Sequence, residues 1–339
     1  MGRSWGEKRM RVEIIGAGAL GMMIAASLTG AGHEVRLVTR TLEQADAIRS
    51  KGLLLSGGME CSAVAGDEEQ VTLYPSAVYA YDELQQDNGC EADAECVLLM
   101  VKQTAITDAF AAFVGGRIRA DGRLVCFQNG IGHTEALSRF IPASRMLLAV
   151  TTEGALRHSL RHVEHTGRGL TWIGALAPDS PTAEDNFFQK KLQSQLQNAG
   201  FAVSLSNQIT SKVWNKLLIN AVINPLTAVL QVTNGALIEL PALSPLMRSL
   251  YEEACGLADK LGIPIAPDLW EQVLEVCRLT ANNRSSMLQD VQSRRRTELD
   301  SITGGLLVKA RETGYKLPTH EAVYALVRSI EQQWETQNS

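Results

Sequence analysis

The chain has 339 residues, of which 45% are hydrophobic and 20% charged, and its formal net charge is −5. This length suits two domains, and this apolar content is enough to bury a core in each of them. Acidic and basic residues are interleaved, and the one basic cluster, Arg294 to Arg296, is too short to neutralise a run of phosphates. The composition therefore argues against nucleic acid as a partner.

Apolar runs near the start are short and carry charges such as Glu13, so we expect neither a signal peptide nor a membrane span and predict a cytoplasmic protein. The six cysteines are scattered without a Cys-x-x-Cys pair. This pattern favours reduced, mostly buried thiols over disulfides, and no metal site is predicted.

The first part of the chain alternates strands with helical segments. After a disordered extension over residues 1–9, residues 11–15 predict a buried strand, a glycine loop follows, and a helix runs to about Gly30. A second strand from His33 to Val38 completes a β-α-β unit. Further strands are predicted at residues 96–101, 124–127, 146–151 and 199–205, with a hairpin within 154–173. We therefore expect an α/β domain of the Rossmann type over residues 10–206.

No strand pattern follows residue 208, so residues 207–335 are predicted to form an all-α domain. Its helices are expected at residues 208–230, 245–261, 267–288, 298–313 and 320–335.

The loop between the first strand and the first helix is Gly16-Ala17-Gly18-Ala19-Leu20-Gly21. A Gly-x-Gly-x-x-Gly motif alone is weak, but this one follows a strand and opens a helix within a β-α-β unit. Gly16 permits a tight turn, Gly18 lets a pyrophosphate approach the backbone, and Gly21 lets the helix pack closely on the strand. The loop therefore predicts a dinucleotide cofactor.

The end of the second strand, where a carboxylate commonly binds the adenosine ribose of NAD, has the sequence Thr39-Arg40-Thr41. Arg40 can pair bidentately with a 2′-phosphate, and Thr39 or Thr41 can add a hydrogen bond, so NADP is favoured over NAD. The alternative is an exposed arginine without a ligand.

Lys102 and Asn129 each follow a predicted strand, at the edge where open α/β sheets bind ligands. A lysine there can also be merely solvated, and Asn129-Gly130 can be a plain turn. Position alone leaves both roles open.

The first helix of the second domain is apolar except for a narrow line of Lys216, Asn220 and Asn224. Spaced at i, i+4 and i+8, these side chains span only about 80° of the helix surface. Polar groups that are buried without partners are destabilising, so a ligand is their natural partner; the alternative is a stripe that faces solvent.

Two late segments carry further polar candidates. Thr297, with Asp300 three residues later, resembles a capping box at a helix start, which leaves Ser286 and Glu298 available for other roles. On one continuous helix Ser286 and Glu298 would lie roughly 18 Å apart, too far to share a small substrate. We therefore predict a break near residues 292–296.

Seven short motifs together resemble the ketopantoate reductase (2-dehydropantoate 2-reductase) family over nearly the whole chain. They are the glycine loop 16–21, Val101-Lys102, Gln128-Asn129-Gly130, Trp214 to Leu217, Asn220 to Ala228, Ser285 to Asp290 and Thr297 to Asp300. The resemblance implies NADPH-dependent reduction of ketopantoate to pantoate in the pathway to pantothenate and coenzyme A. It also implies a Rossmann domain followed by a helical domain, with the site in the cleft between them.

The resemblance further assigns roles to individual residues. Lys216 would be the general acid, and Glu298 would hold the substrate hydroxyl. The implied substrate ligands are Asn220, Asn224, Asn234 and Ser286. Lys102 and Asn129 would lie against the nicotinamide side of NADP(H).

The chain departs from the family pattern by extra residues before Met10 and between Asp82 and Ala94, and by the basic cluster at Arg294 to Arg296, which could alter the acid accepted. Two rival functions stay open: a reductase of another branched 2-oxo acid, and a non-catalytic module that senses NADP(H). A sensor needs no proton donor, so the complete set of Lys216, Asn220 and Glu298 argues against the second. A homodimer is possible, but the sequence does not determine the oligomeric state.

Overall fold

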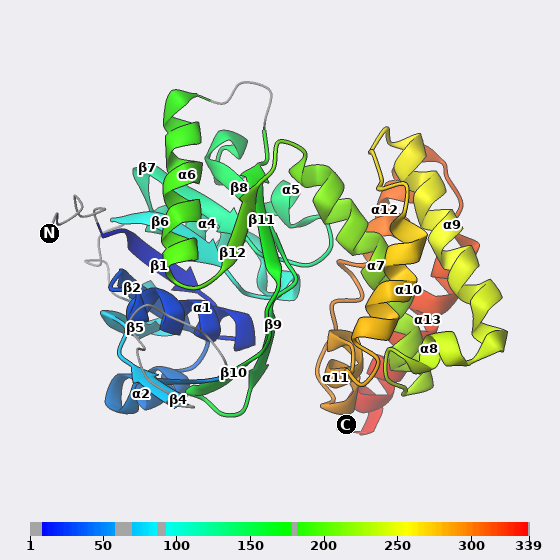
Figure 1. Cartoon of the computed structure of the whole chain (residues 1–339), viewed down its shortest axis with the longest axis horizontal. Coiled ribbons are helices and arrows are strands. Elements are labelled where there is room, and N and C mark those ends of the chain that lie inside the picture. Colours follow the sequence, from blue (N-terminus) through cyan, green and yellow to red (C-terminus); the bar gives the residue numbers. More distant parts are fainter. Residues whose placement is uncertain (1–8, 58–69, 87–92, 178–181, 338–339) are drawn as a thin grey trace, which may run out of the picture. The chain divides into compact units, whose positions relative to one another are not determined.

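The computed structural model describes residues 9–57, 70–86, 93–177 and 182–337. The extension predicted over residues 1–9 and the extra segment predicted between Asp82 and Ala94 lie largely outside these residues. The chain divides into two compact units (Figure 1). Unit 1 comprises the residues up to Val101, Ala105–Gln128 and Glu135–Ile209, and unit 2 comprises Lys102–Thr104, Asn129–Thr134 and the chain from Thr210.

Unit 1 is built on an eight-stranded sheet in which only β8 and β11, among neighbouring strands, run antiparallel. Across the sheet the strands are β12 (Ala202–Leu205), β11 (Leu170–Ala175), β8 (Met146–Thr151), β7 (Ile118–Cys126), β6 (Ala94–Leu99), β1 (Arg11–Ile15), β2 (Glu34–Thr39) and β5 (Ala77–Ala80). The predicted Rossmann-type α/β fold is confirmed. The strands β1 and β8 begin and end at the predicted residues, whereas β7 begins earlier than predicted.

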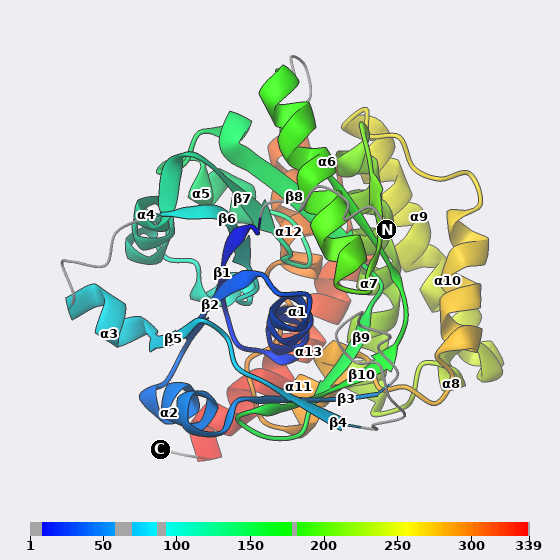
Figure 2. The same ribbon diagram turned by 60° about the vertical axis from the view of Figure 1, so that its left-hand side comes forward.

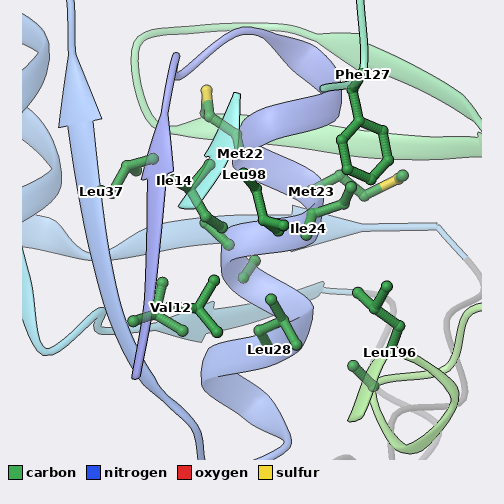
Figure 3. Close-up of a cluster of buried hydrophobic side chains, with 14 of the residues drawn as sticks. Val12, Ile14, Met22, Met23, Ile24, Leu28, Leu37, Leu98, Phe127 and Leu196 are labelled. Atoms are coloured by element: carbon green, nitrogen blue, oxygen red, sulfur yellow. The ribbon is translucent and has the colours of Figure 1, made fainter. Parts of the chain in front are cut away.

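Helix α1 (Ala19–Gly30) contacts strands of the large sheet and of a second, four-stranded sheet. The second sheet has the order β4 (Gln70–Leu73), β3 (Leu53–Ser56), β10 (His162–Gly167) and β9 (Gly154–Arg157). Because strands cover α1 on both sides, every residue from Gly21 to Leu28 is buried, which explains why this helix is apolar all round (Figure 2). Figure 3 shows its methionine and leucine side chains packed among residues of β1, β2 and β6.

The hairpin predicted within residues 154–173 is only partly correct. Strands β9 and β10 do pair antiparallel, but β11 leaves them and joins the large sheet beside β8. The remaining helices of this part of the chain are α2 (Leu42–Lys51), α3 (Tyr81–Gln86), α4 (Asp108–Arg117), α5 (His133–Leu137) and α6 (Ala183–Asn198), with 3₁₀ turns η1 (Gln103–Ala105) and η2 (Ala143–Arg145).

Unit 2 is all-α over its described residues, as predicted. Its helices are α7 (Ile209–Leu230), α8 (Ala236–Glu239), α9 (Ser244–Lys260), α10 (Leu269–Leu279), α11 (Ser286–Gln292), α12 (Thr303–Thr313) and α13 (Pro318–Gln337), with a 3₁₀ turn η3 (Pro241–Leu243). Helix α9 packs against α12 and α13.

The single helix predicted over residues 267–288 is wrong, because the chain leaves the helix at Thr280 and starts α11 at Ser286. The amide of Asn234 donates to the carbonyl of Asn283, and that of Gly235 donates to Ala281, so tertiary hydrogen bonds hold this connection in a non-helical form. The hydroxyl of Ser285 then caps α11 by accepting from the amide of Leu288 at 3.0 Å.

The break predicted between Ser286 and Glu298 is confirmed, since α11 ends at Gln292 and Arg294 adopts a left-handed conformation with φ of 50°. The helix start predicted at Glu298 is wrong: α12 begins at Thr303. Thr297 does not cap α12, because its hydroxyl donates to Glu331.

Helix α7 is the one helix in the described residues that is long and apolar enough to cross a membrane, but 61% of its apolar window is buried. Its side chains Trp214, Leu217 and Leu218 contribute to the core of unit 2 together with Leu257 and Leu306. Burial of this kind is typical of the central helix of a globular unit.

Candidate active site

The glycine loop of unit 1 requires each of its glycines for a different reason. Gly16 has φ of +117°, and a Cβ there would lie 2.8 Å from the backbone of Met100. A Cβ at Gly21 would lie 1.9 Å from the carbonyl oxygen of Gly16, so the close approach of α1 to the loop depends on this glycine. A Cβ at Gly18 would meet no atom within 4 Å, and this exposed position leaves space beside the backbone.

In the described part of the chain, no side chain caps the N-terminus of α1. Its N-cap residue is Gly18, which offers no side-chain hydrogen bond, and the first turn carries no acidic residue. The first amides of the helix and its dipole therefore provide a site suited to an anion. Loop and helix together fit the pyrophosphate of a dinucleotide.

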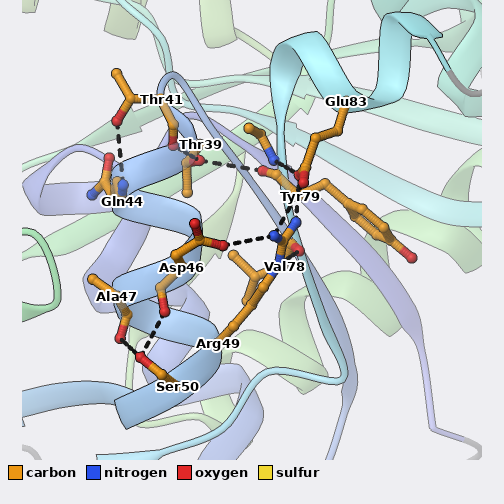
Figure 4. Close-up of polar contacts among 11 residues, drawn as sticks. Thr39, Thr41, Gln44, Asp46, Ala47, Arg49, Ser50, Val78, Tyr79 and Glu83 are labelled. Atoms are coloured by element: carbon orange, nitrogen blue, oxygen red, sulfur yellow. Dashed lines mark hydrogen bonds and ion pairs between the residues drawn. The ribbon is translucent and has the colours of Figure 1, made fainter.

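Strand β2 ends at Thr39, and Arg40 and Thr41 follow it. Figure 4 shows Thr39 and Thr41 with their hydrogen-bond partners. Thr39 is buried, and its hydroxyl donates to the carbonyl oxygens of Thr41 at 2.8 Å and Tyr79 at 3.3 Å. Of the two hydroxyls predicted as alternative donors to a 2′-phosphate, that of Thr39 is therefore already committed within unit 1, which leaves Thr41. The hydroxyl of Thr41 accepts from the amide of Gln44, which leaves its proton available, and Arg40 is exposed beside it.

Lys102 and Asn129 follow β6 and β7, and the short segments that contain them belong to unit 2. The Nζ atom of Lys102 lies 2.5 Å from Oδ2 of Asp290 on α11. The Nδ2 atom of Asn129 donates to Oε2 of Glu298 at 3.0 Å. Both predicted residues thus contact carboxylates of unit 2. Asp290 was not predicted as a site residue, although it lies within the motif Ser285 to Asp290.

Glu298 is a buried carboxylate, with 8% of its surface exposed. Burial raises its pKa; the hydrogen bond from Asn129 and the positive charges of Lys102 and Lys216 act against that rise, while Asp290 adds to it. The side chain therefore holds its charge less readily than an exposed glutamate does.

Lys216 projects from α7, and burial lowers the pKa of its ammonium to about 8 although the carboxylate of Glu298 raises it. An ammonium with this pKa is mostly protonated at neutral pH and gives up its proton far more readily than an exposed lysine. Such a group is suited to general acid catalysis.

The other members of the polar line on α7 differ in their exposure. Asn220 is partly exposed, whereas Asn224 is buried near a hydrogen bond of 2.7 Å between the hydroxyls of Thr227 and Ser285. That bond ties the start of α11 to α7. Ser286, the first residue of α11, is exposed. The hydroxyl of Ser286 on α11 and the side-chain amides of Asn220 and Asn224 on α7 are therefore the candidate ligands of a substrate.

Asn234 is buried in the connection between α7 and α8. Its Nδ2 atom donates to the hydroxyl of Thr280 at 2.8 Å, and its Oδ1 atom is buried without a hydrogen-bond partner in the described part of the chain. A buried acceptor of this kind is costly unless a ligand or water satisfies it.

One unit is of the Rossmann type with a glycine loop suited to an anion, and the other holds a partly buried lysine and a buried glutamate near amide side chains. Together these features define a dinucleotide-binding oxidoreductase. Comparison with known proteins narrows this class. Residues 12–178 match the model of the family described as Ketopantoate reductase PanE/ApbA, and residues 208–331 match the model of its C-terminal domain. The chain belongs to the ketopantoate reductase PanE/ApbA family.

Individual relatives cover almost the whole chain. The 2-dehydropantoate 2-reductase of Bacillus subtilis (strain 168) is 32% identical over 323 residues, which are 95% of this chain and 98% of the relative. The enzyme of the same name from Archaeoglobus fulgidus is 31% identical, again over 95% of this chain and 98% of the relative.

Solved structures show the same fold. The PanE/ApbA family ketopantoate reductase of Ralstonia eutropha JMP134 superposes with a TM-score of 0.81 at 25% identity, covering 96% of this chain and 100% of that one. A D-mandelate dehydrogenase solved with NADH and anilino(oxo)acetate gives a TM-score of 0.82 over 96% of this chain and 99% of that one. Its identity of 23% shows a shared fold alone.

Proposed function

We propose that this protein is an NADPH-dependent 2-dehydropantoate 2-reductase that converts ketopantoate to pantoate on the pathway to pantothenate and coenzyme A. The observation that carries the proposal is the cluster of unit 2 in which Lys216 has a pKa of about 8 and Glu298 is buried and hydrogen-bonded to Asn129. Membership of the ketopantoate reductase family supports the choice of substrate.

The cofactor would be held by the glycine loop 16–21, with its pyrophosphate against the first amides of α1, whose uncapped N-terminus fits an anion. When bound, NADPH supplies a hydride from C4 of its nicotinamide. Lys102 and Asn129 are proposed to face the nicotinamide side. We assign cofactor binding to a domain of residues 10–206, and we assign catalysis mainly to a helical domain of residues 207–335.

Lys216 acts on the other side of the reaction. Reduction of a ketone builds negative charge on its oxygen, and the ammonium of Lys216 stabilises that charge and transfers a proton to it. The neutral amine left behind regains a proton from water. Because its pKa is about 8, most Lys216 side chains carry the required proton at neutral pH.

Glu298 is proposed to accept a hydrogen bond from the hydroxyl of ketopantoate. The donors and acceptors of Asn220, Asn224, Asn234 and Ser286 are proposed to bind the rest of the acid. Two observations support a ligand at this position: the Oδ1 atom of Asn234 has no hydrogen-bond partner among the described residues, and Ser286 is exposed.

The choice of NADP over NAD rests on Arg40 and Thr41. Loss of a charge-assisted phosphate contact costs about 1.5–3 kcal/mol, so Arg40→Ala should weaken NADPH binding about 10- to 150-fold and leave NADH binding unchanged. Arg157→Ala, which removes another exposed arginine of unit 1, is the matched control. An unchanged preference for NADPH in Arg40→Ala would refute this assignment.

The substrate is tested with the unmodified enzyme and a panel of 2-oxo acids, with turnover followed by NADPH oxidation. Ketopantoate should give the highest kcat/KM of the panel. Preference for another branched 2-oxo acid would replace the substrate, and binding of NADPH without turnover of any acid would indicate a sensor. A cytoplasmic location and a homodimer stay predictions. Light scattering on the purified protein tests the homodimer.

A further inference from the structure

The loop that carries Glu298, residues 297–301, is not helical and is held by hydrogen bonds from two directions within unit 2. On one side, Asn129 donates to the carboxylate of Glu298, and the amide of Ile131 donates to the carbonyl of Ser301 at 3.0 Å. The backbone at Gly130 lies so close that a Cβ there would be 2.1 Å from the carbonyl oxygen of Ser301. This side is therefore tightly packed.

On the other side, three side chains of α13 bind the residues that flank Glu298. Tyr324, Arg328 and Glu331 are spaced at i, i+4 and i+7, which places them on one face of the helix. We propose that they are positioning residues, which fix the carboxylate of Glu298 where it binds the 2-oxo acid; the inference rests on the function proposed above for Glu298.

Glu331 makes the closest connection. Its Oε1 atom accepts from both the amide of Thr297, at 2.8 Å, and the hydroxyl of Thr297, at 2.7 Å. The side chain is buried, with 7% of its surface exposed, so water cannot readily replace these bonds. Two bonds to the residue directly before Glu298 restrict the rotation of the backbone at which that side chain begins.

Asp300 is fixed in the same way on the far side of Glu298. Its Oδ1 atom accepts from the hydroxyl of Tyr324 at 2.7 Å and from Arg328. Arg328 also donates to Oε2 of Glu331 at 2.6 Å, so one guanidinium links both anchors. The anchors therefore form one network, and charged hydrogen bonds of this kind are stronger than neutral ones.

The network of Tyr324, Arg328 and Glu331 should affect catalysis through the position of Glu298. Within this loop the amides of Ser301 and Ile302 donate to the carbonyl of Glu298, which fixes its backbone but not its side chain. A displacement of about 1 Å at a reacting group can cost about 100-fold in rate. Loss of the α13 anchors should therefore reduce turnover through Glu298 while NADPH, bound through the glycine loop, keeps its affinity.

The test measures ketopantoate kinetics and NADPH affinity for Glu331→Leu, Glu331→Gln and Glu253→Leu. Glu253 is the matched control, because it also binds α13, accepting from the amides of Thr319 at 2.8 Å and His320 at 3.1 Å. Among the described residues it makes no hydrogen bond to residues 297–301. We expect Glu331→Leu to lower kcat/KM about 10- to 100-fold with an unchanged Kd for NADPH. Glu331→Gln keeps an acceptor for Thr297, so it should retain most of the kcat/KM of the unmodified enzyme.

A double-mutant cycle separates positioning from general stability. If Glu331 acts through Glu298, then Glu331→Leu should cost little further activity in a Glu298→Gln background. Equal losses in both backgrounds, or equal losses from Glu331→Leu and Glu253→Leu, would overturn the inference. Thr297→Val and Thr297→Ser repeat the cycle with smaller changes if Glu331→Leu fails to fold.

A failure of the proposed function can be distinguished from a failure of the positioning role. It appears in the unmodified enzyme as absence of ketopantoate turnover, before any α13 variant is measured. In that case the cycle is run with the acid that the enzyme does reduce, and the same outcomes decide the role of Glu331.

Discussion

The pKa of Lys216 leads to a quantitative prediction for the pH dependence of ketone reduction. A general acid must be protonated, so kcat/KM should be constant at neutral pH and fall as pH rises through about 8, where Lys216 loses its proton. At pH 9 about 9% of such side chains stay protonated, whereas about 96% of lysines with an ordinary pKa near 10.4 would. Burial should thus cost about tenfold in kcat/KM between pH 7 and pH 9.

The assay is kcat/KM from pH 6 to pH 10 for the unmodified enzyme and for Glu298→Gln. The charge of Glu298 raises the pKa of Lys216, so its removal should move the basic limb to lower pH. A profile that stays flat to pH 10, or a basic limb that persists unchanged in the residual activity of Lys216→Ala, would refute the assignment of this limb to Lys216.

Three predictions concern the stability of the units. The carboxylate of Glu13 and the guanidinium of Arg117 form a buried bidentate pair at 2.6 and 2.7 Å. In urea unfolding, Arg117→Met should lower the free energy of unfolding by about 3–5 kcal/mol, and the double variant with Glu13→Leu should recover most of that loss. Equal instability of the single and the double variant would contradict this prediction. Arg294 has φ of 50°, so Arg294→Gly should raise the free energy of unfolding by about 0.5–1 kcal/mol, and a lower melting temperature would count against that strain. Gly130→Ala should lower both melting temperature and kcat/KM, because its φ is +81° and its Cβ would clash with the carbonyl of Ser301; a normal enzyme would show that the loop can shift.

Features set by neighbouring residues could be predicted from the sequence. The glycine loop is one, because the conformation of Gly16 and the close contact at Gly21 are set by the turn between β1 and α1. The polar line on α7 is another, since helical spacing alone places Lys216, Asn220 and Asn224 on one face.

Features that depend on distant residues could not be predicted. Lys102 and Asp290 are 188 residues apart, and Asn129 and Glu298 are 169 residues apart, so no local pattern connects them. The four-stranded sheet was missed for the same reason, because β3 pairs with β10 more than a hundred residues later.

The predictions of helix boundaries in unit 2 were wrong where tertiary hydrogen bonds replaced local ones. Thr297 and Asp300 have the spacing of a capping box, but both side chains bond to α13 instead, and α12 starts only at Thr303. The sequence contained a clue to this arrangement in the spacing of Tyr324, Arg328 and Glu331, although that spacing alone also fits an ordinary solvated helix face.

The pKa shifts of Lys216 and Glu298 favour a functional site over a structural ion pair. A lysine and a carboxylate that pair only to stabilise a fold shift each other toward the charged forms, so the pKa of the lysine rises and that of the acid falls. Here burial outweighs the attraction on both sides: the pKa of Lys216 is lowered to about 8, and that of Glu298 is raised. Both groups are thus held closer to their neutral forms than they would be in water, which is destabilising for the protein alone. An arrangement with this cost, beside the amides of Asn220 and Asn224, is expected where a substrate completes the hydrogen bonds and receives a proton.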